Sequence, residues 1–303
     1  MTEIRHSLTE SLRLEVRSEG LLAVCFDAMA SPCEVLLPAQ HRSDAIEIGS
    51  VVANEAWRVE RKYSRYRKDS VVSVIHRSRG SRIVVDDETA SLIDFAQHCF
   101  DISNGMFDIT SGVLRAVWHF DQSDRLPEPS DIQRLLPLIG FQKLHWRRPV
   151  LMLPSDMELD FGGCGKEYAV DRAYGLLATR YAEPFLINFG GDLRANQAPP
   201  SDTWKIGIER PDTIREASMV LELEQGALAT SGDSHRYLMR NGTRFGHILN
   251  PLTGWPVPAA PRSVTVAASS CTEAGLLSTL ALLKGAEAEQ FLGDSGVRYW
   301  VNR

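Results

Sequence analysis

The sequence lacks the features that mark several common classes of protein. None of its apolar runs approaches the roughly 18 residues that a membrane-spanning helix needs. The first 20 residues carry charges of both signs and have no apolar centre, so they do not predict a secretory signal. An excess of basic residues is also missing. The net charge of −6 argues against nucleic acid as a partner, because phosphate contacts need a basic face.

Signatures of common hydrolases and of zinc sites are absent as well. The sequence contains no Gly-x-Ser-x-Gly, no His-Glu-x-x-His and no Cys-x-x-Cys, and its eight histidines are scattered. The five cysteines lie in apolar contexts, which is typical of buried, reduced thiols. Together with the missing export signal, this predicts a cytoplasmic protein without a membrane span.

The composition bounds the fold. With 303 residues, 44% of them hydrophobic, the chain is long enough for one large domain or two closely joined ones. We expect a single domain over residues 21–303, preceded by an N-terminal extension over residues 1–20. The order of elements mixes β-meanders with β-α units. This favours the α+β class, with mixed β-sheets and flanking helices, over a doubly wound parallel sheet.

Hydrophobic periodicity gives a coarse set of elements. Helices are expected over residues 43–63, 88–105, 166–182 and 271–285. Strands are expected over residues 21–29, 32–39, 143–154, 157–161, 262–268 and, with a break at Gly190-Gly191, 184–196, among others. The last helix has Thr272 as its expected N-cap. It also carries an unusual glycine in its first turn, Gly275, and two hydroxyl residues in its apolar centre.

Polar and small residues collect in four segments: 104–121, 159–171, 187–193 and 229–257. In LDFGGCGKEYAVD (159–171) a glycine-rich turn precedes a helix that starts near Lys166. Backbone N–H groups exposed at such a turn suit a phosphate. A tight turn with glycines for packing explains this segment equally well, because neither nucleotide-binding glycine signature is present.

The other three segments also have structural explanations. In INFGGDL (187–193), Asp192 is expected to close a turn through its own side chain. In the segment 229–257, His247 follows a strand among Ser, Asp, His and Thr residues, a density that favours a ligand site. In NGMFDITSGVLRAVWHFD (104–121), Asp108 and Thr110 either cap a helix or line a pocket for an aromatic ring.

Taken in order, these segments resemble a variant subgroup of the family of FAD:protein FMN transferases, the ApbE-like flavin transferases. The resemblance covers residues 26–303. It rests on DAMASPCEV (27–35), YSRYRKDSVVSVIHRS (63–78), GMFDITSGVLRAVWHF (105–120), LDFGGCGKEYAVD (159–171), INFGGDLRA (187–195), ATSGD (229–233), HILNPLTGWPV (247–257) and SVTVAASSCTEAGLLST (263–279). Several short motifs in one order are more specific than any one of them. The resemblance implies an ApbE-like, T-fold-related architecture.

The resemblance also implies a chemistry. Enzymes of this family bind FAD and one or two Mg²⁺ ions, and they transfer FMN to a Ser or Thr hydroxyl of an acceptor protein with release of AMP. The step is a phosphoryl transfer in which metal neutralises charge on the phosphate oxygens.

The resemblance assigns the site residues by motif. The flavin or adenine pockets would be lined by Met29, Tyr66, Phe107, Asp108 and Ile109. Further contacts with FAD would come from Asp160, Lys166 and Ile248. The Gly163 carbonyl and the Thr279 hydroxyl would bind Mg²⁺. The catalytic residue would be His247, which lies beside the diphosphate and orients or polarises it.

The sequence departs from the family pattern at several positions, among them Gly162-Gly163, where the family often has Ser-Ala or a similar pair. The last family motif usually reads Ala-Asp-Ala-Leu-Ser-Thr, which aligns Gly275 with a metal-binding Asp. In a regular helix Glu273 cannot replace that acid, because two residues rotate its side chain about 200° away from the face that carries Thr279. Glu167 stands where the family usually has Gly.

Two hypotheses follow from these departures. In the first, the protein is an Mg²⁺-dependent FAD:protein FMN transferase, whose metal relies on the remaining ligands, on water and on substrate oxygens. In the second, it is an FAD-binding protein without transferase activity, which serves as a carrier, sensor or partner subunit. Higher activity after Gly275→Asp would favour a weakened form of the first. The acceptor protein and the oligomeric state leave no trace in the sequence.

Overall fold

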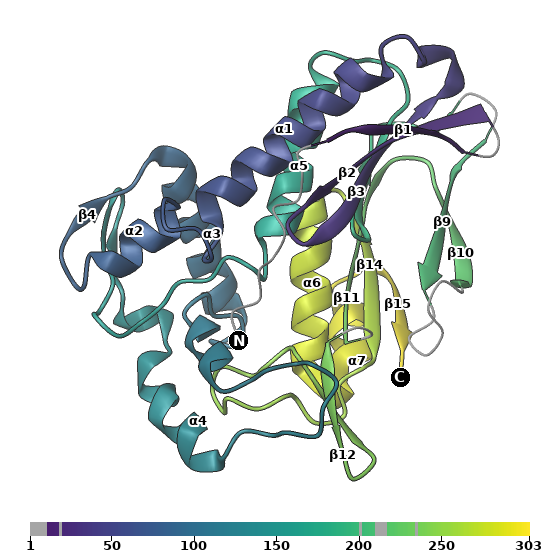
Figure 1. Ribbon diagram of the computed structural model, residues 1–303. Helices are drawn as coiled ribbons and strands as arrows, with labels where there is room; N and C mark the ends of the chain where they lie inside the picture. Colours follow the sequence, from purple (N-terminus) through teal and green to yellow (C-terminus); the bar gives the residue numbers. More distant parts are fainter. Residues whose placement is uncertain (1–10, 18–19, 200–201, 210–216, 234–235) are drawn as a thin grey trace.

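The structure, a computed structural model, describes residues 11–17, 20–199, 202–209, 217–233 and 236–303. An eight-stranded sheet forms its centre, in the order β1-β2-β3-β7-β8-β11-β14-β15, and each neighbouring pair is antiparallel (Figure 1). Its strands are β1 (Arg13–Val16), β2 (Leu21–Ala28), β3 (Ser31–Pro38), β7 (Leu186–Phe189), β8 (Asp192–Ala195), β11 (Gly226–Gly232), β14 (Ser263–Ala268) and β15 (Arg298–Asn302).

Three helices cover one face of this sheet. They are α1 (Ala45–Tyr63), α5 (Gly165–Ala178) and α6 (Cys271–Lys284), which pack on β2 and β3, on β7 and β8, and on β11 and β14 respectively (Figure 1). The short helix α7 (Ala288–Asp294) follows α6 and packs against it. The main hydrophobic core lies between the sheet and this helical layer.

Alternate residues of the central strands face two different cores, as the period of a strand requires. Ile187 belongs to the main core, whereas its neighbour Leu186 belongs to a second core on the opposite face. That second core is closed by the hairpin of β9 (Trp204–Glu209) and β10 (Ala217–Leu223), with Trp204 fully buried in it.

The remaining elements extend beyond the helical layer (Figure 1). These are α2 (Val71–Arg77), α3 (Asp87–Ile102), α4 (Pro129–Leu135), the three-stranded sheet β4-β6-β5 (Ile83–Val84, Val150–Met152, His145–Arg147) and the hairpin of β12 (Tyr237–Arg240) and β13 (Thr243–Gly246). A third core joins α4 and β12 to the 3₁₀ helix η3 (Ser111–Ala116) around Trp118. Among the described residues, no helix combines the length and the apolar character needed to cross a membrane.

The expected α+β class is confirmed, as are the four long helices. Two strand predictions are wrong. Residues 143–154 form a hairpin, because Pro149 at its turn has no N–H group for a ladder. Residues 157–161 form no strand. Their backbone N–H groups bond elsewhere: Leu159 to His76 Nε2 at 2.8 Å, and Asp160 to the Ile109 carbonyl at 2.8 Å.

Candidate functional site

A cavity of about 1130 Å³ opens beside the helical layer and is lined by segments from most of the chain. The eleven residues that the sequence resemblance assigned to the site all line this cavity: Met29, Tyr66, Phe107, Asp108, Ile109, Asp160, Gly163, Lys166, His247, Ile248 and Thr279. The structure therefore brings together residues that are up to 250 positions apart in the sequence. The role of each one remains a prediction.

The glycine-rich turn over residues 162–165 places the N-terminus of α5 in the cavity wall. The Phe161 carbonyl accepts hydrogen bonds from the N–H groups of Cys164 and Gly165, and no side chain caps the helix. A Cβ on Gly163 would lie 3.4 Å from the Phe107 ring, so the backbone lies close to that ring. An uncapped helix N-terminus on a cavity wall presents the positive end of the helix dipole to a ligand.

Asp160 lies at the entrance to this turn and is held on two sides. Its carboxylate forms an ion pair with Arg65 and accepts a hydrogen bond from the Gly162 N–H at 2.9 Å. A Cβ on Gly112 would lie 2.9 Å from the Asp160 Cβ, so glycine is needed there for close packing. The sequence analysis missed Arg65, although it lies within the quoted segment 63–78.

The first residue of α5 with a long side chain is Lys166, and it pairs across the cavity wall with Asp192. Their Nζ and Oδ2 atoms are 2.8 Å apart, and the Asp192 side chain is only 3% exposed. Burial acts to lower the pKa of Lys166, but the adjacent carboxylate outweighs it and the net shift is upward. Lys166 is therefore a permanently charged ammonium group on the cavity wall.

The turn between β7 and β8 differs from the expectation. Gly190 and Gly191 both have positive φ, at 59° and 97°. The side chain that closes the turn belongs to Asn188, whose Oδ1 accepts from the Gly191 N–H at 2.9 Å. Asp192 does not close it, because its carboxylate instead bonds Lys166 and accepts from the Thr230 N–H at 3.3 Å.

Glu167, the next residue of α5, points into the same wall and was missed by the sequence analysis as a site residue. It is 8% exposed, and its Oε2 atom has no hydrogen-bond partner. Burial, followed by the nearby charge of Asp192, raises the pKa of Glu167 to about 8. Only the departure from the family's usual Gly hinted at this position.

The N-terminus of α6 is capped differently from the prediction. The N-cap is Ser270 and not Thr272, and its side chain accepts from the Glu273 N–H. Asp171 of α5 adds a second cap, because its carboxylate accepts from the N–H groups of Cys271 and Thr272 at 3.0 and 2.8 Å. The first turn is thus regular, and Glu273 is exposed and bonded to Ser269.

The two hydroxyl residues of α6 have distinct roles. Ser278 is fully buried and donates to the Gly275 carbonyl at 3.0 Å. Thr279 lines the cavity, and its Oγ1 lies 2.9 Å from the Oγ of Ser231 on β11. A pair of hydroxyls therefore faces the cavity one helical turn beyond Gly275.

The Asp108 carboxylate is used within the protein. It accepts hydrogen bonds from the backbone N–H and the hydroxyl of Thr110 and from the N–H of Phe141. Burial nevertheless raises its pKa. Neither Asp108 nor Thr110 caps η3 with its side chain; together they bond the backbone of residues 140–141, and Asp108 also lines the cavity beside Phe107.

The imidazole of His247 is buried and neutral. Burial, with the charge of Arg236, lowers its pKa to about 4, and within the described part of the chain, which leaves out residues 234–235, its Nδ1 atom has no hydrogen-bond partner. The ring packs edge-on against Phe120, with centroids 6.2 Å apart. A neutral ring nitrogen without a partner is free to bond a ligand in the cavity.

A ready-made metal centre of acidic or aromatic ligands is not part of this site. Over the described ranges, no three His, Cys, Asp or Glu residues cluster in a way that could hold a metal ion. The oxygen atoms that do line the cavity wall near α6 are hydroxyls, backbone carbonyls and the two carboxylates of Glu167 and Asp192. Such hard oxygen donors suit Mg²⁺, which commonly keeps several waters and substrate oxygens.

Comparisons with known proteins agree with this geometry. Residues 29–299 match the ApbE family. The chain is 27% identical to the FAD:protein FMN transferase of Treponema pallidum over 245 residues, which cover 74% of this chain and 67% of that protein. It is 28% identical to the enzyme of the same name from Vibrio cholerae, over 76% of this chain and 71% of that protein.

Solved structures show the same fold. The ApbE protein of Thermotoga maritima superposes with a TM-score of 0.83 at 27% identity, over 92% of this chain and 93% of that one. The apo flavinyl transferase ApbE of Pseudomonas stutzeri superposes with a TM-score of 0.79 at 26% identity, over 96% and 91%. These names agree with the expected transferase class. Because the family match spans nearly the whole chain, the protein belongs to the ApbE family.

Proposed function

We propose that this protein is an Mg²⁺-dependent FAD:protein FMN transferase, which moves FMN from FAD onto a Ser or Thr hydroxyl of an acceptor protein and releases AMP. The observation that carries the proposal is the convergence of the eleven motif residues on one cavity of about 1130 Å³. That volume suits a dinucleotide, since pockets for smaller ligands range from roughly 300 to 1,000 Å³.

Two features of the cavity suit the diphosphate of FAD. The uncapped N-terminus of α5 offers the backbone N–H group of Gly163, and Lys166 adds a full positive charge. Lys166 is held in place by Asp192, so little side-chain entropy is lost when it contacts a phosphate. These residues bind and orient the phosphate that is to be attacked.

Apolar and aromatic side chains suit the rings at either end of the substrate. Phe107 and Ile109 are buried in the cavity wall, and Tyr66 is 64% exposed at its rim. An exposed tyrosine at a cavity rim offers a flat face for stacking, and its burial by a ring would gain about 1 kcal/mol or more. We assign these residues to the flavin and adenine rings.

Mg²⁺ would be held by the Gly163 carbonyl and the Thr279 hydroxyl together with substrate oxygens. When bound, it supplies neutralisation of charge on the diphosphate oxygens. His247 keeps its imidazole neutral, so the unpartnered Nδ1 atom can hydrogen-bond a phosphate oxygen as a donor or the acceptor hydroxyl as an acceptor. In either case His247 orients a reacting group.

One observation favours a second candidate, an FAD-binding protein without transferase activity. The position that the family motif gives to a metal-binding Asp is Gly275, which has no side chain. A protein that binds FAD but lacks a metal site would serve as a carrier, sensor or partner subunit.

A flavin-transfer assay separates the two candidates. The protein is incubated with FAD, Mg²⁺ and an acceptor domain that carries a flavinylation motif, and a denaturing gel is viewed under ultraviolet light. A fluorescent acceptor band that EDTA removes is the expected result. Binding of FAD without any such band would favour the second candidate.

A further inference from the structure

Glu167 is the starting point, because its surroundings do not explain it as a structural residue. A carboxylate that is 8% exposed normally has a cation or several hydrogen-bond donors around it. Its neighbour Lys166 is already paired with Asp192, and among the described residues the buried Oε2 atom of Glu167 has no hydrogen-bond partner. The side chain nevertheless lines the cavity.

The space that Glu167 occupies is provided by Gly275 of α6. A Cβ built on Gly275 would lie 2.5 Å from Glu167 Cγ and 2.7 Å from Oε1. The close atom is in the middle of the side chain, so no small rotation of a flexible end relieves the clash. The glycine in the first turn of α6 is therefore required by Glu167, despite its cost of about 1 kcal/mol to the helix.

The register of α5 and α6 places Glu167 against Gly275, one turn before the predicted metal ligand Thr279. Asp171 contacts the N–H of Cys271, and Glu167, one turn earlier on α5, contacts Gly275, one turn later on α6. The helices therefore run antiparallel in steps of one turn. Gly163, in the turn before α5, and Thr279, one turn beyond Gly275 on α6, line the same cavity.

The oxygen atoms along this register form one hard donor set. The carboxylate of Glu167 lies against Gly275 and lines the same cavity as the hydroxyl pair of Thr279 and Ser231 and as Gly163. A carboxylate, a hydroxyl and a backbone carbonyl are oxygen ligands of the kind that Mg²⁺ and Mn²⁺ take.

We propose that Glu167 supplies, from α5, the carboxylate that binds the divalent cation in this cavity, and that Gly275 is small in order to admit it. Compared with the family motif, the metal-binding acid would thus lie on α5 instead of α6, within the same cavity. This inference rests on the proposed function for the presence of the cation. It predicts that Gly275→Asp alone does not improve the enzyme, since Glu167 already fills that space.

The test measures Mn²⁺ binding directly, by the electron paramagnetic resonance signal of the free ion, with saturating FAD present. Glu167→Gln keeps the shape of the side chain and removes its charge, so we expect Mn²⁺ affinity to fall at least about tenfold. Glu167→Ala, a second variant, should lose as much. Thermal unfolding of each variant verifies that it is folded.

Two further variants serve as controls. Glu273→Gln changes an exposed carboxylate on the first turn of α6, and it should leave the affinity within about twofold of the wild type. The exchange Glu167→Gly with Gly275→Asp returns the acid to α6 and should bind Mn²⁺ more tightly than either Glu167→Gln or Glu167→Ala. Unchanged affinity in Glu167→Gln, or no binding of Mn²⁺ by the wild type, overturns the inference.

The transfer assay on the same samples separates this inference from the proposed function. EDTA-sensitive transfer by the wild type, with Mn²⁺ affinity unaffected by Glu167→Gln, overturns the inference and leaves the function intact. Loss of Mn²⁺ affinity in Glu167→Gln, with no transfer by the wild type, supports the metal ligand and overturns the function.

Discussion

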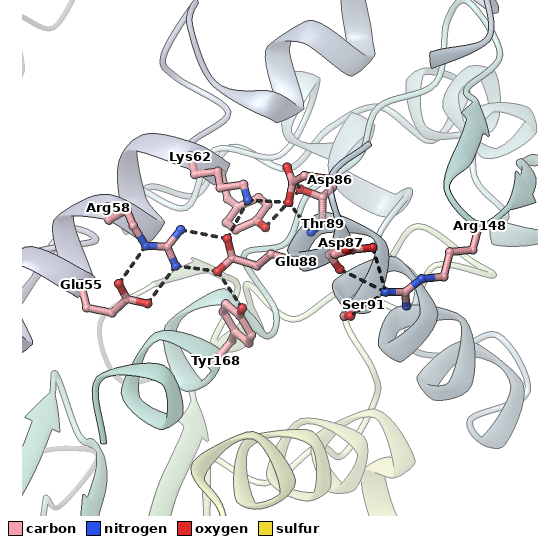
Figure 2. Close-up of polar contacts among 11 residues, drawn as sticks. Glu55, Arg58, Lys62, Asp86, Asp87, Glu88, Thr89, Ser91, Arg148 and Tyr168 are labelled. Atoms are coloured by element: carbon pink, nitrogen blue, oxygen red, sulfur yellow. Dashed lines mark hydrogen bonds and ion pairs between the residues drawn. The ribbon is translucent and has the colours of Figure 1, made fainter. Parts of the chain in front are cut away.

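Helix α5 carries two clusters of charged residues that are built in opposite ways. The first, which we call the interhelical network, joins α5 to α1 and α3 and consists of Glu55, Arg58, Lys62, Asp86, Glu88 and Tyr168 (Figure 2), together with Arg172. The second, which we call the pocket cluster, lies on the cavity wall and consists of Lys166, Glu167 and Asp192. Tyr168 of the network directly follows Glu167 in the sequence.

Partners surround the charges at the centre of the interhelical network. Glu88 accepts hydrogen bonds from Arg58, from Lys62 at 2.6 Å and from the Tyr168 hydroxyl at 2.8 Å (Figure 2). Burial acts to raise the pKa of Glu88, but these donors outweigh it and lower the pKa to about 2. Glu55, which is 6% exposed, is bonded by both Arg58 and Arg172.

The pocket cluster is incomplete by comparison. It has one cation for two buried carboxylates, and the second carboxylate, Glu167, keeps an oxygen without a partner. Burial raises the pKa of both acids. The paired charges between α1, α3 and α5 therefore hold the fold together, whereas the unpaired carboxylate of Glu167 is left for a ligand. The following predictions test that division.

The largest expected effect is a difference in the rate of FMN transfer between lysine variants of the two clusters. We expect Lys166→Met to lower the rate of FMN transfer by about 100-fold or more, because it deletes the charge assigned to the diphosphate. To keep Asp192 from being buried as an unpaired charge, the same change is also made together with Asp192→Asn. Initial rates of acceptor fluorescence measure the effect.

The matched control is Lys62→Met in the interhelical network. Lys62 contacts Asp86 and Glu88 and does not line the cavity, so transfer should stay within about twofold of the wild type. The free energy of unfolding should fall by about 1 kcal/mol. An equal loss of transfer in both lysine variants would show that the two clusters do not divide as described.

Because of the contact between Glu167 and Gly275, the effect of Gly275→Ala on the free energy of unfolding should have opposite signs with and without the Glu167 side chain. In the wild-type background, Gly275→Ala overpacks the wall and should lower the free energy of unfolding by about 1–2 kcal/mol. In a Glu167→Ala background the clash is gone, and the same change should raise it by about 0.5–1 kcal/mol through helix propensity. Urea unfolding of the four proteins gives the coupling. Additive effects would contradict the packing described.

The last prediction concerns how the stability that the interhelical network provides depends on pH. Because the folded-state pKa of Glu88 is lowered to about 2, its stabilisation is present above its ordinary pKa and is lost as the pH falls through about 2. Glu88→Gln should therefore cost about 1–2 kcal/mol at pH 7, after allowance for partial exposure, and progressively less toward pH 2.

Urea unfolding at a series of pH values checks this dependence. Glu224→Gln, which alters an exposed side chain, should show no such trend. A cost of Glu88→Gln that stays constant with pH would mean that the ionised carboxylate is not what the network stabilises.

The sequence predicted the long helices well, because their apolar residues recur with a clear period. It failed where distant contacts decide local structure. Residues 157–161 alternate like a strand, but their N–H groups find partners in His76 and Ile109. Likewise Thr272 satisfies the local rule for an N-cap, but Asp171, 101 residues away, bonds it and Ser270 starts the helix instead.

The sequence predicted which residues line the site but not how their side chains contact one another. The motif order selected eleven residues that do line one cavity. The role of Glu167 could not be predicted, because it depends on the antiparallel register of α5 and α6 and on the absence of a Cβ at Gly275. Asp192 was visible in its motif, but its pairing with Lys166 requires the β7–β8 turn to lie against the start of α5.

The contact at Gly275 also limits the mutational paths open to this lineage. A side chain at position 275 and a glutamate at 167 compete for the same space, so gaining either while the other is present lowers the stability of the fold. Exchange of one acid for the other is least costly through a chain with small residues at both positions. We therefore expect related sequences to carry an acid at one of these two positions and a small residue at the other.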